Sequence, residues 1–446
     1  MKTFKIYIYT LLALVWVSAC KPSFDTPAPS RGSADFTRYI AVGNSLTAGY
    51  ADGGLYRSGQ LNSYPNMIAT QMQAAGGGSF AQSLFTTDQA NGSGYLRLKS
   101  FDASGNPVID TVKTNVAVRG TATIPGLGTI LLYTKYSGAL ENYGVPGIKL
   151  NDIQNALYGN GNPYYERLLP GNAGTNTTQY LDFITAKSFT FFTNWLGNND
   201  ALGYATSGGA GDVLTDKTTF GNLYSTLLTR LTAGGTGGTG AKGACATIPD
   251  VTTIPYFTTV TVGAVLAGVQ KAVPSIQAIY INAATNAAAT TYAPRPATAN
   301  DLLVLTFQGQ LSAIGKPTTG NPYPYGLDPR NAIESKYVLD QNEAALVKDY
   351  VNSYNATIKA TAAAKGLAVF DAFTFLTNVK TSGLVIDGIS FNSNYISGGL
   401  FSLDGVHLTP RGYAIVANEF IKAINSKYGS SLSIVNVGAY NGIVFP

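Results

Sequence analysis

The sequence predicts an α/β fold, with a parallel sheet that helices cover on both faces. Short apolar runs that end in glycine or in polar clusters alternate with longer runs of helical periodicity. The short runs are typical of strands buried on both faces, as in parallel sheets. The chain has 446 residues, of which 45% are hydrophobic and 12% charged, so it can bury a large core. Together these observations predict an α/β protein.

The first strand and the first helix lie near the start of the chain. Residues 38–43 form the strand, which stops at a glycine. Residues 63–76 form the helix. Ser63 can cap this helix, Pro65 suits its first turn, and Gly76 ends it.

The second half of the chain continues the alternation. Further strands are expected at 188–197, 244–251 and 367–373. Between the first two of these, residues 218–231 form an amphipathic helix. Its apolar face consists of Phe220, Leu223, Leu227 and Leu231.

The last two long helices have clear start signals. Asp340 and Glu343 form a capping-box pair before a helix that stops near Gly366. Thr409 and Pro410 open the final helix. The inner face of that helix consists of Tyr413, Val416, Phe420 and Ile424.

Two regions interrupt this alternation. Residues from about 80 to 140 are β-rich, and residues 94–112 have the pattern of a hairpin. Residues from about 285 to 335 lack clear periodicity. We expect both to be insertions in a single domain that spans residues 37–446.

A glycine-rich stretch, residues 234–245, has the look of a phosphate-binding loop. Such a loop needs a lysine directly after its last glycine, followed by Ser or Thr at the start of a helix. Here Ala241 separates Gly240 from Lys242, and a strand follows. We therefore expect a flexible linker between helix and strand.

The charge distribution argues against nucleic acid as a partner. The formal net charge of +5 is not concentrated in a basic run, so no stripe for phosphates is present. The low charge and the abundance of glycine and tyrosine suit a surface that meets sugars or other neutral matter.

The N-terminal residues 1–19 have the pattern of an export signal. Lys2 and Lys5 precede a short apolar run, residues 6–17, and Cys20 follows two small residues. This ending resembles the bacterial lipobox, and an ordinary signal peptide with an accidental cysteine is the alternative. The resemblance implies cleavage before Cys20 and a thioether-linked lipid there, with chains such as palmitate. It implies a protein anchored to a membrane of the bacterial cell envelope, with the outer membrane favoured.

The remaining N-terminal and cysteine features follow from this assignment. Residues 20–36 are rich in proline and serine and have the composition of a tether. With Cys20 lipidated, Cys245 has no partner for a disulfide within the chain. It lies in an apolar run, so we expect a small buried hydrophobic residue.

Ser45, directly after the first strand, is either a helix cap or a nucleophile. A serine that is activated near neutral pH usually needs an imidazole as base, and His407 is the only histidine. Asp404 lies three positions before His407 and can accept its second ring N–H. The alternative is that Asp404 and His407 only hold the loop before the last helix.

Acyl transfer also needs hydrogen-bond donors for an oxyanion. Asn199 follows a buried strand, at the sheet edge where ligands of parallel sheets bind. The backbone N–H groups of Gly147 and Ser45 are the other candidates. Ordinary turns and loops at Gly147 and Asn199 are the alternatives.

In chain order the sequence shows "GNS" at Ser45, "VPG" at Gly147, "GNND" at Asn199 and "DGVH" at His407. This layout resembles the four blocks of the GDSL/SGNH hydrolase superfamily, from about residue 38 to 425. The resemblance implies a three-layer α/β/α sandwich with a flavodoxin-like parallel sheet.

It also implies the roles of single residues. Ser45 would be the nucleophile, His407 the general base and acid, and Asp404 the residue that orients His407. The oxyanion hole would consist of Ser45 N–H, Gly147 N–H and the Asn199 side chain, with Asp200 supporting the loop of Asn199.

The first block departs from the family pattern in one position. Asn44 stands where the family usually has Asp. The block also differs from the Gly-x-Ser-x-Gly elbow of α/β-hydrolases, because Thr47 occupies the place of the second glycine.

Two functions are consistent with the sequence. The first is a serine esterase that cleaves lipid esters, small acyl esters or acyl groups on polysaccharides through an acyl-enzyme, with a weak preference for glycan deacylation. The second is a non-catalytic cell-surface lipoprotein that binds glycan or a partner. No cofactor or metal is implied, since one histidine and no thiolate cluster leave no zinc site.

Overall fold

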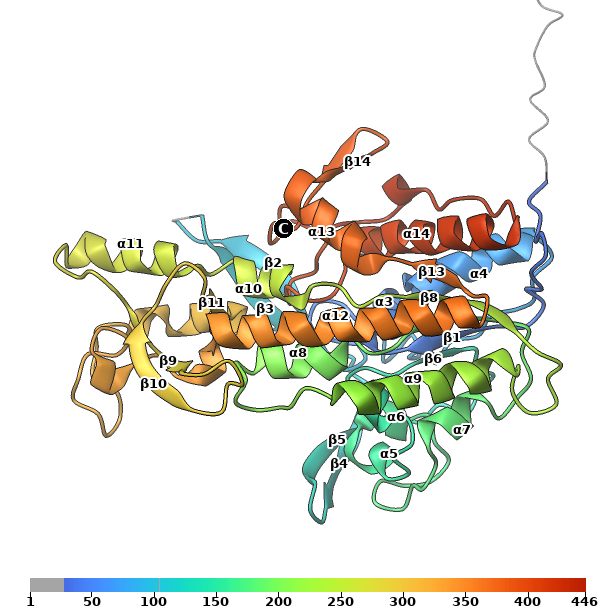
Figure 1. Cartoon of the computed structure of the whole chain (residues 1–446), viewed down its shortest axis with the longest axis horizontal. Coiled ribbons are helices and arrows are strands. Elements are labelled where there is room, and N and C mark those ends of the chain that lie inside the picture. Colours follow the sequence, from blue (N-terminus) through green and yellow to red (C-terminus); the bar gives the residue numbers. More distant parts are fainter. Residues whose placement is uncertain (1–27, 104) are drawn as a thin grey trace, which may run out of the picture.

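The computed structural model describes residues 28–103 and 105–446, with a five-stranded parallel sheet at its centre (Figure 1). Its strands, in chain order, are β1 (Tyr39–Gly43), β6 (Asn142–Gly144), β7 (Phe191–Trp195), β8 (Lys242–Ala246) and β13 (Ala368–Phe370). Their order across the sheet is β13-β8-β7-β1-β6, and every pair is parallel. This is the 2-1-3-4-5 order of flavodoxin-like sheets, so the predicted fold class is confirmed.

The chain order reverses beside β1, and this reversal places the site. The chain passes from β1 to one neighbour, β6, and then to the other neighbour, β7. Ligands of open α/β sheets bind outside the carboxyl ends of the strands at such a switch point. Gly43 at the end of β1 is level with Gly144 and Trp195 at the ends of its neighbours.

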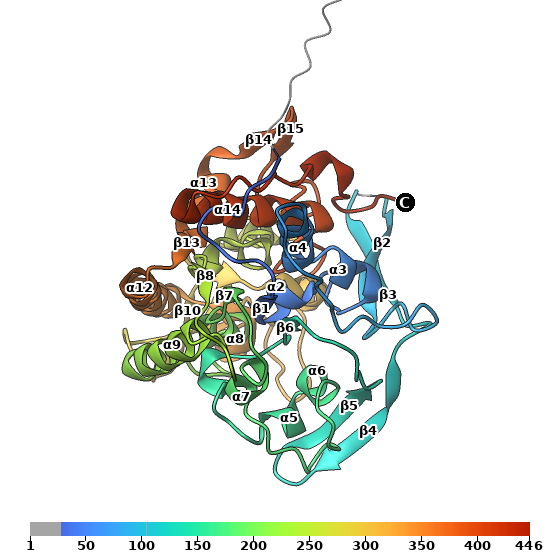
Figure 2. The ribbon, with the colours of Figure 1, turned by 90° about the vertical axis from the view of Figure 1, so that its right-hand side faces the viewer.

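Helices form a layer on each face of the sheet (Figure 2). α4 (Tyr64–Ala74) and α14 (Pro410–Tyr428) pack together on one face, with α14 against β13 and β8. α8 (Asn199–Thr206), α9 (Lys217–Thr232) and α12 (Gln341–Ala364) form the other layer. The architecture is therefore the predicted α/β/α sandwich.

The core between α4, α14 and the sheet is rich in aromatic rings. Phe420 of α14 stacks on Tyr64 of α4, with the ring centroids 5.0 Å apart, and meets the Trp195 ring of β7 at 5.9 Å. Every residue of β1 and β7 is buried, as expected for strands covered on both faces. All four residues of the predicted inner face of α14 are buried as well.

The start signals of the last two long helices are confirmed. Asp340 and Glu343 make both hydrogen bonds of a capping box, and the Thr409 hydroxyl accepts a hydrogen bond from the Gly412 N–H. Ser63 does precede α4, but the expected side-chain cap is wrong. Its hydroxyl donates to the Gln82 side chain instead, because a buried segment lies directly beside it.

The two regions that interrupt the alternation contain hairpins and irregular structure. The first contains the hairpins β2 (Tyr95–Phe101) with β3 (Pro107–Val112) and β4 (Val118–Ile124) with β5 (Gly128–Tyr133). Short strands further along are β9 (Tyr280–Ala284), β10 (Tyr292–Pro296), β11 (Leu302–Leu303), β12 (Val338–Leu339), β14 (Leu384–Ile386) and β15 (Ile389–Phe391). The remaining α-helices are α2 (Ser45–Ala48), α3 (Arg57–Leu61), α5 (Tyr158–Gly161), α6 (Pro163–Glu166), α7 (Tyr180–Ile184), α10 (Pro255–Thr258), α11 (Val262–Ala272) and α13 (Ala372–Ser382).

Residues 234–241 of the glycine-rich stretch lie between α9 and β8, where a linker is expected, and the rest of the stretch belongs to β8. β8 ends at Ala246, earlier than the predicted strand, because Asp250 already caps a short 3₁₀ helix. Cys245 within β8 is buried and free.

Cys20 and most of the predicted signal and tether lie outside the described residues. In residues 28–103 and 105–446, no helix combines the length and apolar character that crossing a bilayer requires.

Candidate active site

Ser45, His407 and Asp404 form a chain of two hydrogen bonds with His407 in the middle, which we call the relay. Ser45 is the first residue of α2, two positions after β1 ends, and His407 lies in the loop before α14. The Ser45 Oγ is 2.8 Å from His407 Nε2, and His407 Nδ1 is 2.9 Å from Asp404 Oδ2. Although 362 residues separate Ser45 from His407, the geometry is that of a serine activated by an oriented imidazole.

The residue before the serine, Asn44, caps α2. Its side-chain oxygen accepts a hydrogen bond of 3.1 Å from the Leu46 N–H, and its side chain is buried. Asn and Asp cap helices about equally well, because each supplies an oxygen acceptor. This equivalence explains how Asn44 replaces the Asp that is usual in this block.

Asp404 is held as a carboxylate. Burial raises its pKa, but the neighbouring His407 and hydrogen bonds from His407 and Val406 outweigh this and hold the pKa well below the usual range. The Asp404 Oδ1 accepts hydrogen bonds from the backbone N–H groups of His407 at 2.8 Å and of Val406 at 2.9 Å. Its side chain is only 14% exposed. An ionised, fixed carboxylate is what stabilises an imidazolium on His407.

A second segment contacts Asp404 from the opposite end of the sequence. The Gly53 N–H donates to Asp404 Oδ2 at 2.8 Å, and the Ser402 hydroxyl donates to Asp404 Oδ1 at 3.1 Å. The Tyr50 ring lies beside the His407 ring, with the centroids 4.6 Å apart. The turn after α2 therefore supports the carboxylate and the imidazole together.

The three predicted oxyanion donors lie at the carboxyl ends of neighbouring strands. Ser45 follows β1, Gly147 follows β6, and Asn199 follows β7. The Asn199 Nδ2 donates to the carbonyl of Ile148, which comes directly after Gly147, at 2.9 Å. This bond ties the Asn199 side chain to the Gly147 loop and leaves the second amide hydrogen of Asn199 for a ligand.

Two of these candidates are backbone N–H groups that the described residues leave without an acceptor. The N–H groups of Ser45 and Gly147 donate no hydrogen bond among the described residues. Gly147 has a φ of +85°, a conformation that favours glycine. Gly147 and Ser45 follow neighbouring parallel strands, so their N–H groups lie at the same edge of the sheet.

Asp200 supports the Asn199 loop, as the sequence suggests. Its carboxylate accepts hydrogen bonds from the Leu150 N–H at 2.6 Å, the Asn151 N–H at 3.2 Å and the Thr215 hydroxyl at 2.7 Å. Burial raises the pKa of Asp200 to about 6. It fixes the start of α8 to the chain beyond Gly147 and does not reach Ser45.

Ser45, Asn199 and His407 open onto one small pocket. Its volume is about 50 Å³, far below the roughly 300–1,000 Å³ of sites for drug-sized ligands. The apolar side chains of its wall are Leu46, Leu202, Pro249, Val251, Ile254 and Val406. Such a pocket suits a short acyl group beside the serine.

The described residues contain no group of three or more His, Cys, Asp or Glu side chains that could hold a metal ion. The polar groups around the serine instead form a base, an orienting carboxylate and candidate donors for an oxyanion. This combination is the machinery of acyl transfer.

Comparison with models of protein families matches residues 39–420 to "GDSL-like Lipase/Acylhydrolase". The chain belongs to this family. The match covers most of the chain and includes every member of the relay, so the resemblance read from the four sequence blocks is confirmed. Membership makes the protein a carboxylic ester hydrolase.

Solved structures similar to this GDSL-like hydrolase are enzymes of low sequence identity. An α/β-hydrolase enzyme from the metagenome of Lake Arreo is 10% identical, with a TM-score of 0.34 and coverage of 88% of this chain and 96% of that one. A lipase/acylhydrolase from Enterococcus faecalis is 12% identical, with a TM-score of 0.32 and coverage of 89% and 100%. An extracellular lipase from Streptomyces rimosus is 11% identical, with a TM-score of 0.31 and coverage of 88% and 99%. No curated protein matches the chain.

Sequence reasoning missed two parts of the site of this GDSL-like hydrolase. One is the support of Asp404 by Gly53, which lies 351 positions away in the sequence. The run "ADGGLY" after the nucleophile was the available signal, since consecutive glycines there mark a tight turn beside the serine. The other is the apolar wall from the segment after β8, which carries no motif.

Proposed function

We propose that this hydrolase cleaves esters through an acyl-enzyme on Ser45. The observation that carries the proposal is the relay of hydrogen bonds from Ser45 through His407 to Asp404. His407 takes the Ser45 proton as the Oγ attacks the acyl carbon, and Asp404 stabilises the imidazolium that results. His407 then gives this proton to the departing alcohol, which leaves an ester of the acyl group on Ser45.

The second half of the reaction uses the same groups. His407 takes a proton from a water molecule, whose oxygen attacks the acyl carbon of the Ser45 ester. The proton returns to Ser45 as the free acid leaves. In both halves the negative oxygen faces the Ser45 N–H, the Gly147 N–H and the second amide hydrogen of Asn199, which we assign as the oxyanion hole.

We assign short acyl groups as the acid part of the substrate. The support is the apolar pocket of about 50 Å³ at Ser45, which has little room for a long chain. For the alcohol part of the ester we favour a neutral glycan, because only 12% of residues are charged and tyrosine is abundant. Release of acetate from acetylated xylan, compared with release of fatty acid from phospholipid vesicles, tests this choice. Faster cleavage of the phospholipid would contradict it.

Acyl-chain length gives a first prediction. Hydrolysis of p-nitrophenyl esters by the purified protein should be fastest for acetate to butyrate and at least about tenfold slower in kcat/KM for laurate, because each methylene that does not fit costs about 1–3 kcal/mol. Leu202→Ala should shift the optimum to longer chains by enlarging the pocket. Leu223→Ala, on α9 and outside the pocket, is the matched control. An optimum at laurate, or no turnover at any length, would contradict the proposal.

We also propose that Cys20 carries a lipid that anchors the hydrolase to the cell envelope, with the outer membrane as its site. The support is the signal-like N-terminus, with a cysteine at the expected cleavage position. Bacteria that express the full chain and grow with alkyne-labelled palmitate should incorporate the label into the protein. Cys20→Ala should abolish the labelling, while Cys245→Ala, which changes the buried free thiol, should leave it intact. Equal labelling of the Cys20→Ala variant would overturn the anchor.

A further inference from the structure

Asp52 lies in the turn after α2 and joins the two segments of the site. Its Oδ1 accepts a hydrogen bond of 2.9 Å from the Leu403 N–H, directly before Asp404. Its Oδ2 accepts one of 2.8 Å from the Tyr56 hydroxyl. Its own N–H donates to the Ser402 hydroxyl at 2.9 Å. Asp52 is thus bonded both to the segment that precedes Asp404, through Ser402 and Leu403, and to Tyr56 in its own segment.

The backbone of Asp52 shows that the turn is built for these bonds. Its φ is +52°, a left-handed conformation that is uncommon for residues other than glycine and that Asp tolerates better than most. The same turn directs the Gly53 N–H to Asp404 Oδ2. Residues 52–53 and 402–404 therefore form one clamp, with two carboxylates inside it.

The charged and titratable groups around Asp52 come from several elements. Asp404 and His407 from the loop before α14 both act on its charge, with Asp404 opposing ionisation and His407 favouring it. Asp52 also has three tyrosine neighbours, since burial, together with the charge of Asp52, raises the pKa of the hydroxyls of Tyr56, Tyr395 and Tyr413. Arg97 lines the same cavity, but Asp110 binds its guanidinium at 2.9 Å. Of the neighbours from the loop before α14, His407 is therefore the one that favours a negative charge on Asp52.

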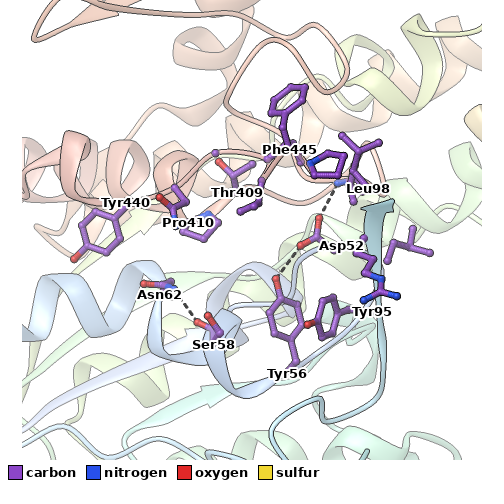
Figure 3. Close-up of a pocket in the computed structure, with 18 of the residues that line it drawn as sticks. Asp52, Tyr56, Ser58, Asn62, Tyr95, Leu98, Thr409, Pro410, Tyr440 and Phe445 are labelled. Carbon is purple, nitrogen blue, oxygen red and sulfur yellow. Dashed lines mark hydrogen bonds between the residues drawn. The ribbon is translucent and has the colours of Figure 1, made fainter. Parts of the chain in front are cut away.

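Asp52 also faces a cavity of about 460 Å³ between α3, the start of β2 and the C-terminal segment (Figure 3). Tyr56 lies in the wall of this cavity and stacks on Tyr95, with the ring centroids 4.2 Å apart. The cavity gives water a route to the carboxylate. Burial raises the pKa of Asp52 to about 6, so it changes charge within the range in which ester hydrolases are assayed.

We propose that Asp52 is a positioning residue of the hydrolase: its carboxylate holds the Asp404 loop through Leu403 and adds a second negative charge that favours the imidazolium of His407. The inference rests on the proposed roles of Ser45, His407 and Asp404. It assigns Asp52 no contact with substrate, so it acts on kcat and leaves KM unchanged. It also gives "ADGGLY" a role, as the half of the clamp next to the nucleophile.

The test is the pH dependence of p-nitrophenyl acetate hydrolysis by the full chain and by Asp52→Asn. Asparagine keeps an acceptor for the Leu403 N–H and resembles the protonated acid. At pH 8 the variant should have about tenfold lower kcat, which corresponds to about 1.4 kcal/mol, with KM unchanged. Below pH 5 the two profiles should converge, because wild-type Asp52 is then also neutral. A ratio that stays the same at every pH, or a variant as active as wild type, would overturn the proposal.

Two tyrosine variants sharpen the test. Tyr56→Phe removes one donor to Asp52 and should lower kcat about threefold, as expected for part of one hydrogen bond. Tyr95→Phe is the matched control: its hydroxyl makes no hydrogen bond among the described residues, and its activity should stay within about twofold of wild type. Thermal melting of each variant reports folding. Absence of hydrolysis by wild type at every pH would refute the proposed function itself, an outcome distinct from failure of the Asp52 proposal.

Discussion

Ser45→Ala is expected to reduce kcat on p-nitrophenyl acetate by about 10⁶-fold, because it removes the hydroxyl that His407 Nε2 contacts. The fold should survive, since the Ser45 hydroxyl bonds to His407 and to no other described residue, while Asn44 still caps α2. The measurement is the hydrolysis rate at saturating substrate, which gives kcat. A thermal melt of the same variant reports whether it is folded.

Ser58→Ala is the control for this substitution. Ser58 is an exposed serine on α3, and the variant should retain full activity. If Ser45→Ala kept even a hundredth of the wild-type kcat, Ser45 would not be the nucleophile. Another residue of this chain would then have to attack the ester.

Asp404→Asn is expected to lower kcat by about 10⁴-fold. Asparagine preserves the size of the side chain, but its amide favours the wrong tautomer of His407 and supplies no charge for the imidazolium. Because the pKa of Asp404 lies well below the usual range, the carboxylate is ionised throughout the working range of an esterase. Its own protonation therefore adds no step to the activity profile above about pH 4.

The measurement for Asp404 is the pH profile of kcat/KM from pH 4 to 9. Asp349→Asn is the matched control, because Asp349 is an exposed residue of α12 that pairs with Lys217. An Asp404→Asn variant within tenfold of wild type would mean that His407 is oriented by other groups, such as the adjacent Tyr50 ring.

Much of the fold was predictable because its signals are local. β1 and β7 are apolar runs that stop at a turn, and Thr409 and Asp340 are helix caps that act within three residues of themselves. The relay was predictable for a different reason. A chain with a single histidine allows only one imidazole base, so composition alone linked His407 to Ser45.

The parts that the sequence did not predict depend on contacts between distant segments. Ser63 has the local character of a cap, yet its hydroxyl bonds to Gln82, which no periodicity reveals. Asp52 reads as an ordinary turn residue until Leu403 is placed beside it. The apolar wall at Val251 and Ile254 belongs to a segment that leaves the sheet after β8, and only packing brings it to the serine.

The central claim, that Ser45 is the nucleophile activated by His407, is tested most directly by covalent capture. The full chain is treated with a fluorophosphonate, digested, and its peptides are mapped by mass. One adduct should form, on Ser45, in step with the loss of esterase activity, and the His407→Ala variant should react at least about a thousandfold more slowly. An adduct on another residue, or complete inactivation with Ser45 unmodified, would contradict the assignment.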